Sequence, residues 1–444
     1  MSTRRMSAAQ AIAFGFALII LIGTILLMLP ISNKSGNSIS FLNALFTSTS
    51  ATCVTGLVVF DTWSQFTLFG QIVILILIQI GGLGFMTFAV LFSFALKKRI
   101  GLRERTFLTN SFSSLKIGGI IKLVRRILIG TLIFELGGMI LLAIRFCPYF
   151  GFWQGIWYSV FHSISAFCNA GFDLMGVLGP YSSLAPFSGD ILVNGVIMVL
   201  IVVGGIGFIV WNDIISNGLK WRKYALHTKV ILSTTFILII GSALVFFLTE
   251  SNASMIGMNS SNRILASFFQ AITSRTAGFN SVNISTLSNT GTLLTIILMF
   301  IGAGPGSAAG GIKISTFVVM VLAVISYMKG KEDVDIFQRR IEPQIVRRAF
   351  TSTVFYFVLA MCGVAIISSV ELFSLKDVFF EVFSALGTVG LSMGITAGLG
   401  VVSKIVIIIL MYSGRISSLT LIIAVTKSRR KTLLHNPVDK VIIG

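Results

Sequence analysis

The sequence predicts an all-α integral membrane protein built from four pseudo-repeats around one central pore. Each repeat would consist of an outer helix, a re-entrant pore loop and an inner helix, which gives eight transmembrane helices. Three observations lead to this prediction. They are the apolar composition of the chain, the positions of its basic residues, and a Gly-centred segment that recurs four times.

The composition is that of a membrane protein. Of the 444 residues, 55% are hydrophobic and only 11% are charged, and the mean hydropathy is +0.95. A soluble domain is far less apolar than this. The uncharged run 11–30 is about long enough to cross a bilayer as a helix. We interpret it as a retained first helix and not as a signal peptide, because it is too long and lacks a small-residue cleavage site.

The basic residues lie at the ends of the apolar spans. They account for a net charge of +19, and they cluster at Arg4 and Arg5 and in the segments 97–105, 122–126, 219–229, 338–348 and 427–431. This distribution is the positive-inside pattern, which indicates membrane topology and contact with anionic lipid and not binding of nucleic acid. The loops 32–40 and 250–262 carry few charges and should face outside. Both termini would then be cytoplasmic.

Two apolar spans fit between successive basic clusters. The outer helices are expected near residues 11–30, 121–146, 228–249 and 349–370. The inner helices are expected near residues 66–96, 191–215, 291–328 and 400–426. The repeats then cover residues 1–96, 97–215, 216–328 and 329–426, followed by a cytoplasmic tail at 427–444.

A polar segment with a central glycine separates the two spans of each repeat. The four glycines, which are 115, 107 and 112 residues apart, are Gly56, Gly171, Gly278 and Gly390. Six positions before the glycine stands a serine in three of the repeats, namely Ser50, Ser165 and Ser384. The third repeat has Ile272 there, with Thr273 beside it. Self-similarity at a period near 110 residues indicates one structural unit used four times.

Such a segment has a physical role only inside protein. A chain that enters from outside as a short helix at 41–51 and returns as extended backbone cannot face lipid, because its peptide groups would be unpaired. Four of these segments around one axis would converge their carbonyl groups on a narrow path, where the carbonyls replace the water around a dehydrated cation. Glycine at the turn allows backbone angles that other residues avoid.

The four motifs resemble those of the Trk/Ktr/HKT superfamily of potassium transporters, in particular the bacterial KtrB/KtrD-type membrane subunit. They read "SATCVTGL", "SAFCNAGF", "TSRTAGFNS" and "SALGTVGLSMG" in chain order, and the resemblance covers nearly the whole chain. The resemblance implies a potassium-binding selectivity filter made of Val54, Thr55, Gly56, Asn169, Ala170, Gly171, Thr276, Ala277, Gly278, Thr388, Val389 and Gly390. Only the glycine is common to all four segments.

The resemblance also implies partners. The membrane subunits of the family form a homodimer on a cytosolic ring of RCK-type (KtrA/KtrC-like) subunits, which bind a nucleotide. The inside segments of this chain are short basic linkers and a tail, so a nucleotide is expected on the partner and no cofactor is expected in this chain. Potassium is the expected transported ion, and the filter is its only expected metal site. A dependence on sodium stays an open alternative.

The third inner span is too long to be one helix. Residues 291–328 would measure about 57 Å as a continuous helix, against a hydrocarbon core of about 30 Å. We expect the helix to break where glycine and proline are dense. The residues that mark the break are Gly302, Gly304, Pro305, Gly306, Ser307, Gly310, Gly311 and Lys313. The resemblance implies that this break is an intramembrane loop that gates the pore.

Arg415 lies at the depth of this break. It follows Gly390 by 25 residues, as Gly302 follows Gly278 by 24. A guanidinium inside the membrane is costly and usually faces a polar interior. Two interpretations are open: a structural tie to carbonyls of the broken helix, or an electrostatic barrier and latch against the loop, which the resemblance favours. Lys313 could instead snorkel toward the cytoplasmic face.

Other functions fit the sequence less well. A secondary transporter of organic solutes would more naturally show inverted repeats and an intramembrane acidic site. A membrane-embedded enzyme would need a cluster of His, Cys or carboxylate residues, and the three histidines show no ligand spacing. Cys53 and Cys168 share one repeat position and are expected to be buried thiols behind the filter.

Overall fold

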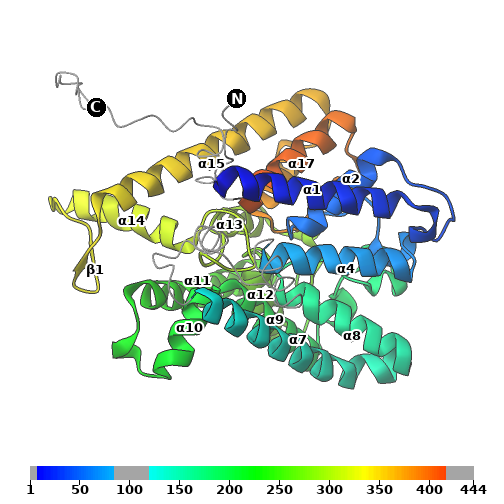
Figure 1. The fold of residues 1–444 in the computed structure, drawn as a ribbon, viewed down its shortest axis with the longest axis horizontal. Coiled ribbons are helices and arrows are strands. Elements are labelled where there is room, and N and C mark those ends of the chain that lie inside the picture. Colours follow the sequence, from blue (N-terminus) through cyan, green and yellow to red (C-terminus); the bar gives the residue numbers. More distant parts are fainter. Residues whose placement is uncertain (1–7, 85–119, 417–444) are drawn as a thin grey trace, which may run out of the picture.

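The protein is mostly helical, with long apolar helices that run along one direction (Figure 1). The structure is a computed structural model that describes residues 8–84 and 120–416. In this part of the chain, four helices are long and apolar enough to cross a membrane on their own. They are α1 (Ala8–Met28), α7 (Ile120–Phe150), α11 (Leu226–Glu250) and α15 (Pro343–Val370). Their positions agree with the outer helices predicted from the sequence.

A shorter helix follows each of these four and packs against it. The shorter helices are α2 (Phe41–Thr52), α8 (Phe152–Phe167), α12 (Ser260–Thr273) and α16 (Leu375–Gly387). The helix expected at 41–51 is thus confirmed by α2. The C-terminal half of each short helix is buried, and an irregular segment that contains one of the four repeated glycines follows it.

A further apolar helix completes each unit. These helices are α4 (Leu68–Leu83), α9 (Ile191–Gly205), α13 (Asn289–Phe300) and α17 (Val401–Ile416). The same order of elements therefore occurs four times in the described residues. The predicted continuations of the first and last inner helices, the basic clusters at 97–105 and 427–431, and the tail lie outside the described residues.

The break in the third inner span is confirmed. Helix α13 ends at Phe300, and α14 (Ile314–Met328) begins only after the glycine-rich segment. The prediction of one helix at 191–215 is wrong, because α9 is followed by α10 (Phe208–Asn217) at an angle of 94°. Gly207 between them has a φ of +99°, which is outside the helical region. The second inner span is therefore broken as well.

The remaining elements are short. After α14 the chain forms a hairpin of β1 (Asp335–Ile336) and β2 (Arg339–Arg340), which pair antiparallel. A one-turn helix, α3 (Thr62–Gln65), precedes α4. The 3₁₀ turns are η1 (Pro30–Ser32), η2 (Met175–Val177), η3 (Ala185–Phe187), η4 (Trp221–Lys223), η5 (Ile284–Thr286) and η6 (Thr396–Gly398).

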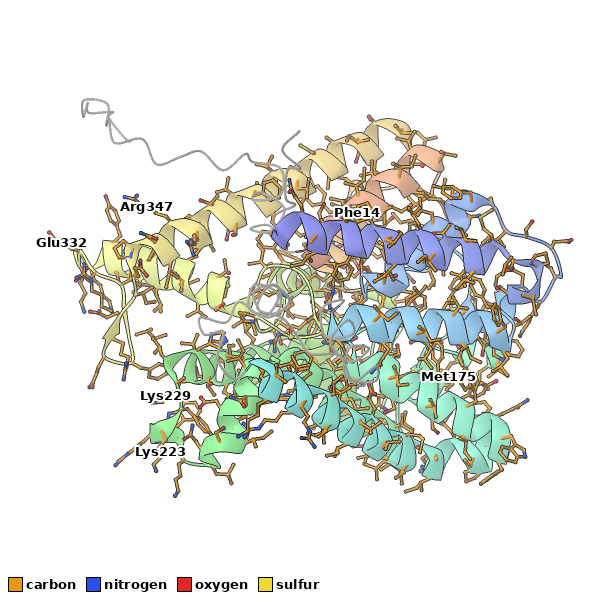
Figure 2. All side chains as sticks on the ribbon, viewed as in Figure 1. Phe14, Met175, Lys223, Lys229, Glu332 and Arg347 are labelled. Carbon is orange, nitrogen blue, oxygen red and sulfur yellow. The ribbon has the colours of Figure 1, made fainter. Side chains whose placement is uncertain are left out.

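The two ends of the molecule differ in character. Lys223, Lys229 and Arg347 lie toward the end that carries the β1–β2 hairpin, whereas Met175 lies toward the opposite end (Figure 2). The long helices between them expose apolar side chains, such as Phe14 of α1, which is 62% exposed. Basic residues at one end and apolar residues along the helices are typical of a protein that spans a bilayer.

Candidate functional site

The four glycines of the repeated segments lie together in a closed ring. A β-carbon built on any one of them would strike the backbone of the next segment in chain order. The β-carbon on Gly56 would lie 2.5 Å from Ala170 O, the one on Gly171 would lie 2.7 Å from Ala277 O, and the one on Gly278 would lie 2.5 Å from Val389 O. The β-carbon on Gly390 would overlap Thr55 O. The fourth segment thus returns to the first. The structure therefore brings the predicted filter residues of all four segments to one place.

The four segments share one backbone conformation. The residue two before each glycine has a left-handed φ, at Val54 (58°), Asn169 (58°), Thr276 (72°) and Thr388 (50°). The glycines themselves have φ values of 93°, 69°, 81° and 92°. A non-glycine residue in this region costs about 1–2 kcal/mol, and such strain persists only where the surroundings impose it. Four repetitions of the same strained shape indicate that the shape itself has a use.

Buried hydroxyl groups hold two of the segments from behind. Ser50 Oγ accepts a hydrogen bond from the N–H of Gly56 at 3.1 Å, and Ser384 Oγ accepts one from the N–H of Gly390 at 3.1 Å. Both serines are fully buried on the short helix that precedes their segment. Each hydroxyl therefore satisfies a backbone donor that turns away from the centre of the ring.

In the other two segments, the hydroxyl bonds the carbonyl of the residue directly after the glycine. Ser165 donates to Phe172 O at 2.7 Å, and Thr273 donates to Phe279 O at 2.7 Å. Thr273 occupies the position beside Ile272, where the third repeat lacks the serine of the other three. Thr273, the residue after Ile272 in the chain, thus supplies the hydroxyl that Ile272 lacks.

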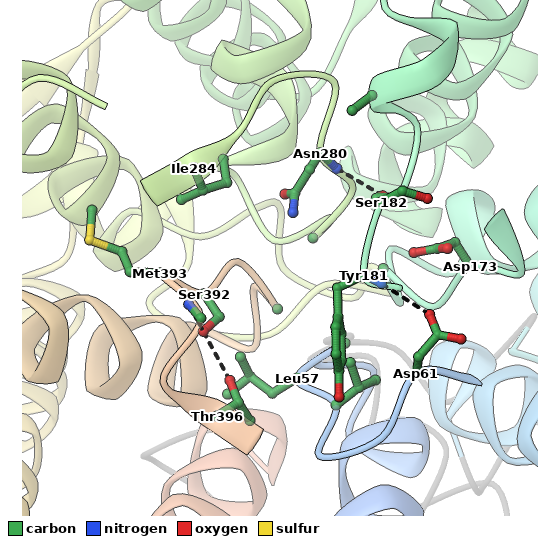
Figure 3. A pocket seen from close by; sticks show the side chains of 18 of the residues that line it. Leu57, Asp61, Asp173, Tyr181, Ser182, Asn280, Ile284, Ser392, Met393 and Thr396 are labelled. Carbon is green, nitrogen blue, oxygen red and sulfur yellow. Dashed lines mark hydrogen bonds between the residues drawn. The ribbon is translucent and has the colours of Figure 1, made fainter. Parts of the chain in front are cut away.

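A cavity of about 430 Å³ opens on one side of the ring (Figure 3). All four glycines line it, and so does a residue one or two positions after each of them, namely Leu57, Phe172, Asn280 and Ser392. Two carboxylates, Asp61 and Asp173, also line it. Asp61 accepts hydrogen bonds from the N–H groups of Ser64 and Tyr181 at 2.8 and 3.2 Å, and Asp173 accepts one from that of Met175 at 2.9 Å. The site residues predicted from the sequence include neither carboxylate, although Asp61 stands five residues after Gly56 and Asp173 two residues after Gly171.

The glycine-rich loop 301–313 covers the opposite side of the fourth segment. A β-carbon on Gly311 would lie 3.1 Å from Gly387 O, and one on Gly310 would overlap the side chain of Thr388. Ile301 and Ile312 form a parallel bridge that closes the loop at its base. The predicted gate residues therefore lie directly beside the predicted filter.

The loop also fills the break between α9 and α10. Gly304 N donates to Gly205 O at 2.9 Å, and the N–H of Phe208, the first residue of α10, donates to Gly306 O at 2.9 Å. These bonds satisfy backbone groups that a continuous helix would have paired internally. The kink in the second inner span and the loop of the third are thus one joint structure.

Arg415 connects this loop to another helix. Its guanidinium donates to Ala308 O in the loop and to Gly81 O near the end of α4, with a longer bond of 3.3 Å to Gly82 O. The contact to α4 was not predicted. Arg415 therefore joins the loop, the first inner helix and its own helix α17, which is compatible with both interpretations offered by the sequence.

Lys313 does not snorkel. Its amine donates to Ala309 O at 2.6 Å and to Gly310 O at 3.4 Å, so it closes the loop on itself. Cys53 and Cys168 are fully buried free thiols, as expected. At their repeat position the third segment has Arg275, which is only 7% exposed. Sequence reasoning missed Arg275, although a charged residue in place of a thiol was visible in "TSRTAGFNS".

Comparisons with known proteins identify the family. A sequence profile of the TrkH family, described as a cation transport protein, matches residues 3–432. The chain belongs to the TrkH family of cation transport proteins. This membership bears out the resemblance, and it makes the protein a transporter and not an enzyme. Within residues 8–84 and 120–416, no three His, Cys, Asp or Glu side chains group as metal ligands.

Named relatives match the TrkH-family chain over nearly its full length. The Ktr system potassium uptake protein B of Bacillus subtilis (strain 168) is 42% identical over 433 residues, which cover 97% of this chain and 96% of that protein. The potassium/sodium uptake protein NtpJ of Enterococcus hirae is 40% identical over 450 residues, with 99% and 98% covered. The solved structure of the potassium transporter TrkH from Vibrio parahaemolyticus has the same fold, with a TM-score of 0.73 at 18% identity, covering 96% of this chain and 86% of that one.

Proposed function

We propose that this chain mediates potassium uptake across the bacterial cell membrane, with the backbone of 54–56, 169–171, 276–278 and 388–390 as the selectivity filter. The observation that carries the proposal is the closed ring of the four segments, in which Gly390 returns to Thr55. Relatives at 42% and 40% identity are named as potassium and potassium/sodium uptake proteins, which supports the choice of ion.

The chemistry of the ring suits a monovalent cation. The filter triplets contain no acidic side chain, so the ligands would be carbonyl oxygens, which replace hydration water without binding a cation too tightly to release it. Asp61 and Asp173 lie in the adjoining cavity. The negative charge of Asp61 would raise the local concentration of cations before they enter the filter.

Loop 302–313 would be the gate. It lies beside Gly387 and Thr388 on the side of the ring away from the cavity, where an ion would leave the filter. Arg415 reaches across to Ala308 O and so holds the loop to α17 and α4. A positive charge near the path repels a cation strongly where water is scarce. We therefore favour the latch over a purely structural tie.

The cellular arrangement is proposed in the same way. We place eight transmembrane helices in four repeats (1–96, 97–215, 216–328 and 329–426), with both termini and the basic end of the molecule in the cytoplasm. The segregation of Lys223, Lys229 and Arg347 to one end supports this orientation. The chain would act as a homodimer on a cytosolic RCK-type ring, which would carry the regulatory nucleotide.

Growth of a potassium-uptake-deficient bacterium on low potassium tests the proposal. Expression of this chain together with an RCK-type subunit should restore growth and rubidium uptake, and expression of a Gly390→Ser variant should not. Uptake of labelled sodium in the same cells shows whether sodium is carried or required. If the parent chain, present in the membrane with its partner, supports no potassium or rubidium uptake, the proposal is wrong.

A further inference from the structure

A buried carboxyl group contacts the chain that follows the fourth glycine. Glu381 lies on α16, nine residues before Gly390, and it is fully buried. Its Oε2 accepts a hydrogen bond from Ser392 Oγ at 2.7 Å, and its Oε1 accepts one from Thr396 Oγ1. Both hydroxyls belong to the chain that leaves the ring after Gly390. The short helix thus holds the outgoing chain through one side chain.

The two hydroxyls form a small network at the wall of the cavity. Thr396 Oγ1 lies 2.9 Å from Ser392 Oγ, which also accepts the N–H of Gly394 at 3.0 Å (Figure 3). Gly390 and Gly394 have φ values of +92° and +100°, which glycine adopts readily and residues with a β-carbon adopt rarely. Glu381 is the buried anchor of that stretch.

The second segment has a related anchor at the same repeat position. His162 lies on α8, nine residues before Gly171, and its Nε2 faces the N–H of Leu174 at 3.4 Å. Its Nδ1 lies 2.7 Å from Tyr158 O, which fits the tautomer that donates from Nδ1 and accepts at Nε2. An anchor nine residues before the glycine therefore occurs in the second and fourth segments, which lie opposite each other in the ring.

The first and third segments are held differently. At the equivalent position, Thr47 donates to its own helix and Phe269 is apolar. The loop after the second segment holds both instead. Tyr181 Oη donates to Val59 O at 3.1 Å in the first outgoing chain, and Leu184 N donates to Asn280 O at 2.9 Å in the third.

We propose that Glu381 is a positioning residue for the fourth filter segment, and that its carboxylate sets the preference for potassium over sodium by fixing the chain just outside Gly390. This inference rests on the proposed function. Each of the two hydroxyls lies on its own oxygen of Glu381, whereas a glutamine side chain has only one oxygen. Glutamine at this position would keep one anchor and turn the other into a contact with an amide donor.

Rubidium and sodium uptake by Glu381→Ala and Glu381→Gln variants tests the inference in the full complex. The alanine variant should lower the rubidium-to-sodium preference about tenfold, the lower end of the effect seen for groups that orient the direct ligands of a metal. The glutamine variant should fall between it and the parent. Ser392→Ala removes one hydroxyl from the other side and should change the preference in the same direction.

Glu371→Gln is the matched control. Glu371 also accepts two hydrogen bonds, from Gly400 N and Ser403 Oγ at 2.7 Å each, but it caps α17 away from the cavity. It should lower thermal stability without altering the preference. The inference is overturned if the Glu381 variants and Ser392→Ala, at parental levels, keep the parental preference, or if Glu371→Gln shifts it equally. Loss of rubidium uptake or of its preference over sodium in Gly390→Ser, with an unchanged preference in Glu381→Ala, would refute the role of Glu381 and leave the proposed filter standing.

Discussion

The ring of glycine segments and the glycine-rich loop beside it are both irregular backbone inside a helical protein, yet they are held in opposite ways. Each ring segment is anchored to its own short helix by a buried hydroxyl, as Ser50 and Ser384 show. The loop is held by backbone bonds to α9 and by the side chain of Arg415 from another helix. Anchors within one unit favour a fixed shape, and anchors between units can be released by a movement of helices.

The composition of the two regions points the same way. The ring segments are surrounded by large buried side chains such as Phe161, Phe269 and Phe380 of the short helices. The loop consists mainly of glycine, alanine and serine, whose small side chains make few packing contacts with neighbouring residues. We infer that the ring selects the ion in a rigid state and that the loop moves.

The largest effect is expected from a side chain placed in the ring. Gly278→Ser would force a residue into φ +81° with its β-carbon 2.5 Å from Val389 O. A distortion of about 1.4 kcal/mol already changes an equilibrium tenfold, so rubidium uptake or its preference over sodium should fall at least about tenfold. Gly241→Ser is the control, because nothing lies within 4 Å of a β-carbon there. Parental uptake and preference in Gly278→Ser would show that the ring is not the filter.

Release of the loop should have the next largest effect. Arg415→Gln removes the bonds to Ala308 O and Gly81 O together with the positive charge, so rubidium flux without the regulatory subunit should rise several-fold. Deletion within 304–310 should act in the same direction. Lys404→Gln is a matched control on α17, because Lys404 bonds Asn43 and not the loop. Unchanged flux in selective variants present at parental levels would mean that the loop is only a structural kink.

A smaller effect is expected from one hydroxyl behind the ring. Ser384→Ala leaves the N–H of Gly390 without its acceptor, which costs about 1–3 kcal/mol for a buried donor. The rubidium-to-sodium preference should fall a few-fold, with little change in basal flux when the partner is absent. Ser403→Ala removes an equally buried hydroxyl outside the ring and should leave the preference intact. An equal change in both variants would indicate general loosening and not support of the filter.

The sequence predicted the parts of the molecule that depend on local pattern. Hydropathy located the outer helices, and the spacing of the glycines located the ring. The break after Gly205 was missed because 191–215 has the length of one span, and its bend depends on bonds to the distant residues Gly304 and Gly306. Glu381 was missed for a similar reason, since its partners follow the ring and reach it only after the chain turns back. Side chains whose partners are set by tertiary contacts leave little trace in local sequence.

The position of the ion itself tests the proposed filter most directly. A structure of the complex in rubidium, with anomalous scattering measured at the rubidium edge, should show density on the axis of the ring between the backbones of Gly56, Gly171, Gly278 and Gly390. Replacement of rubidium by sodium should weaken that density. Well-ordered protein at saturating rubidium with an empty ring, and rubidium bound only elsewhere, would mean that these four segments do not select the ion.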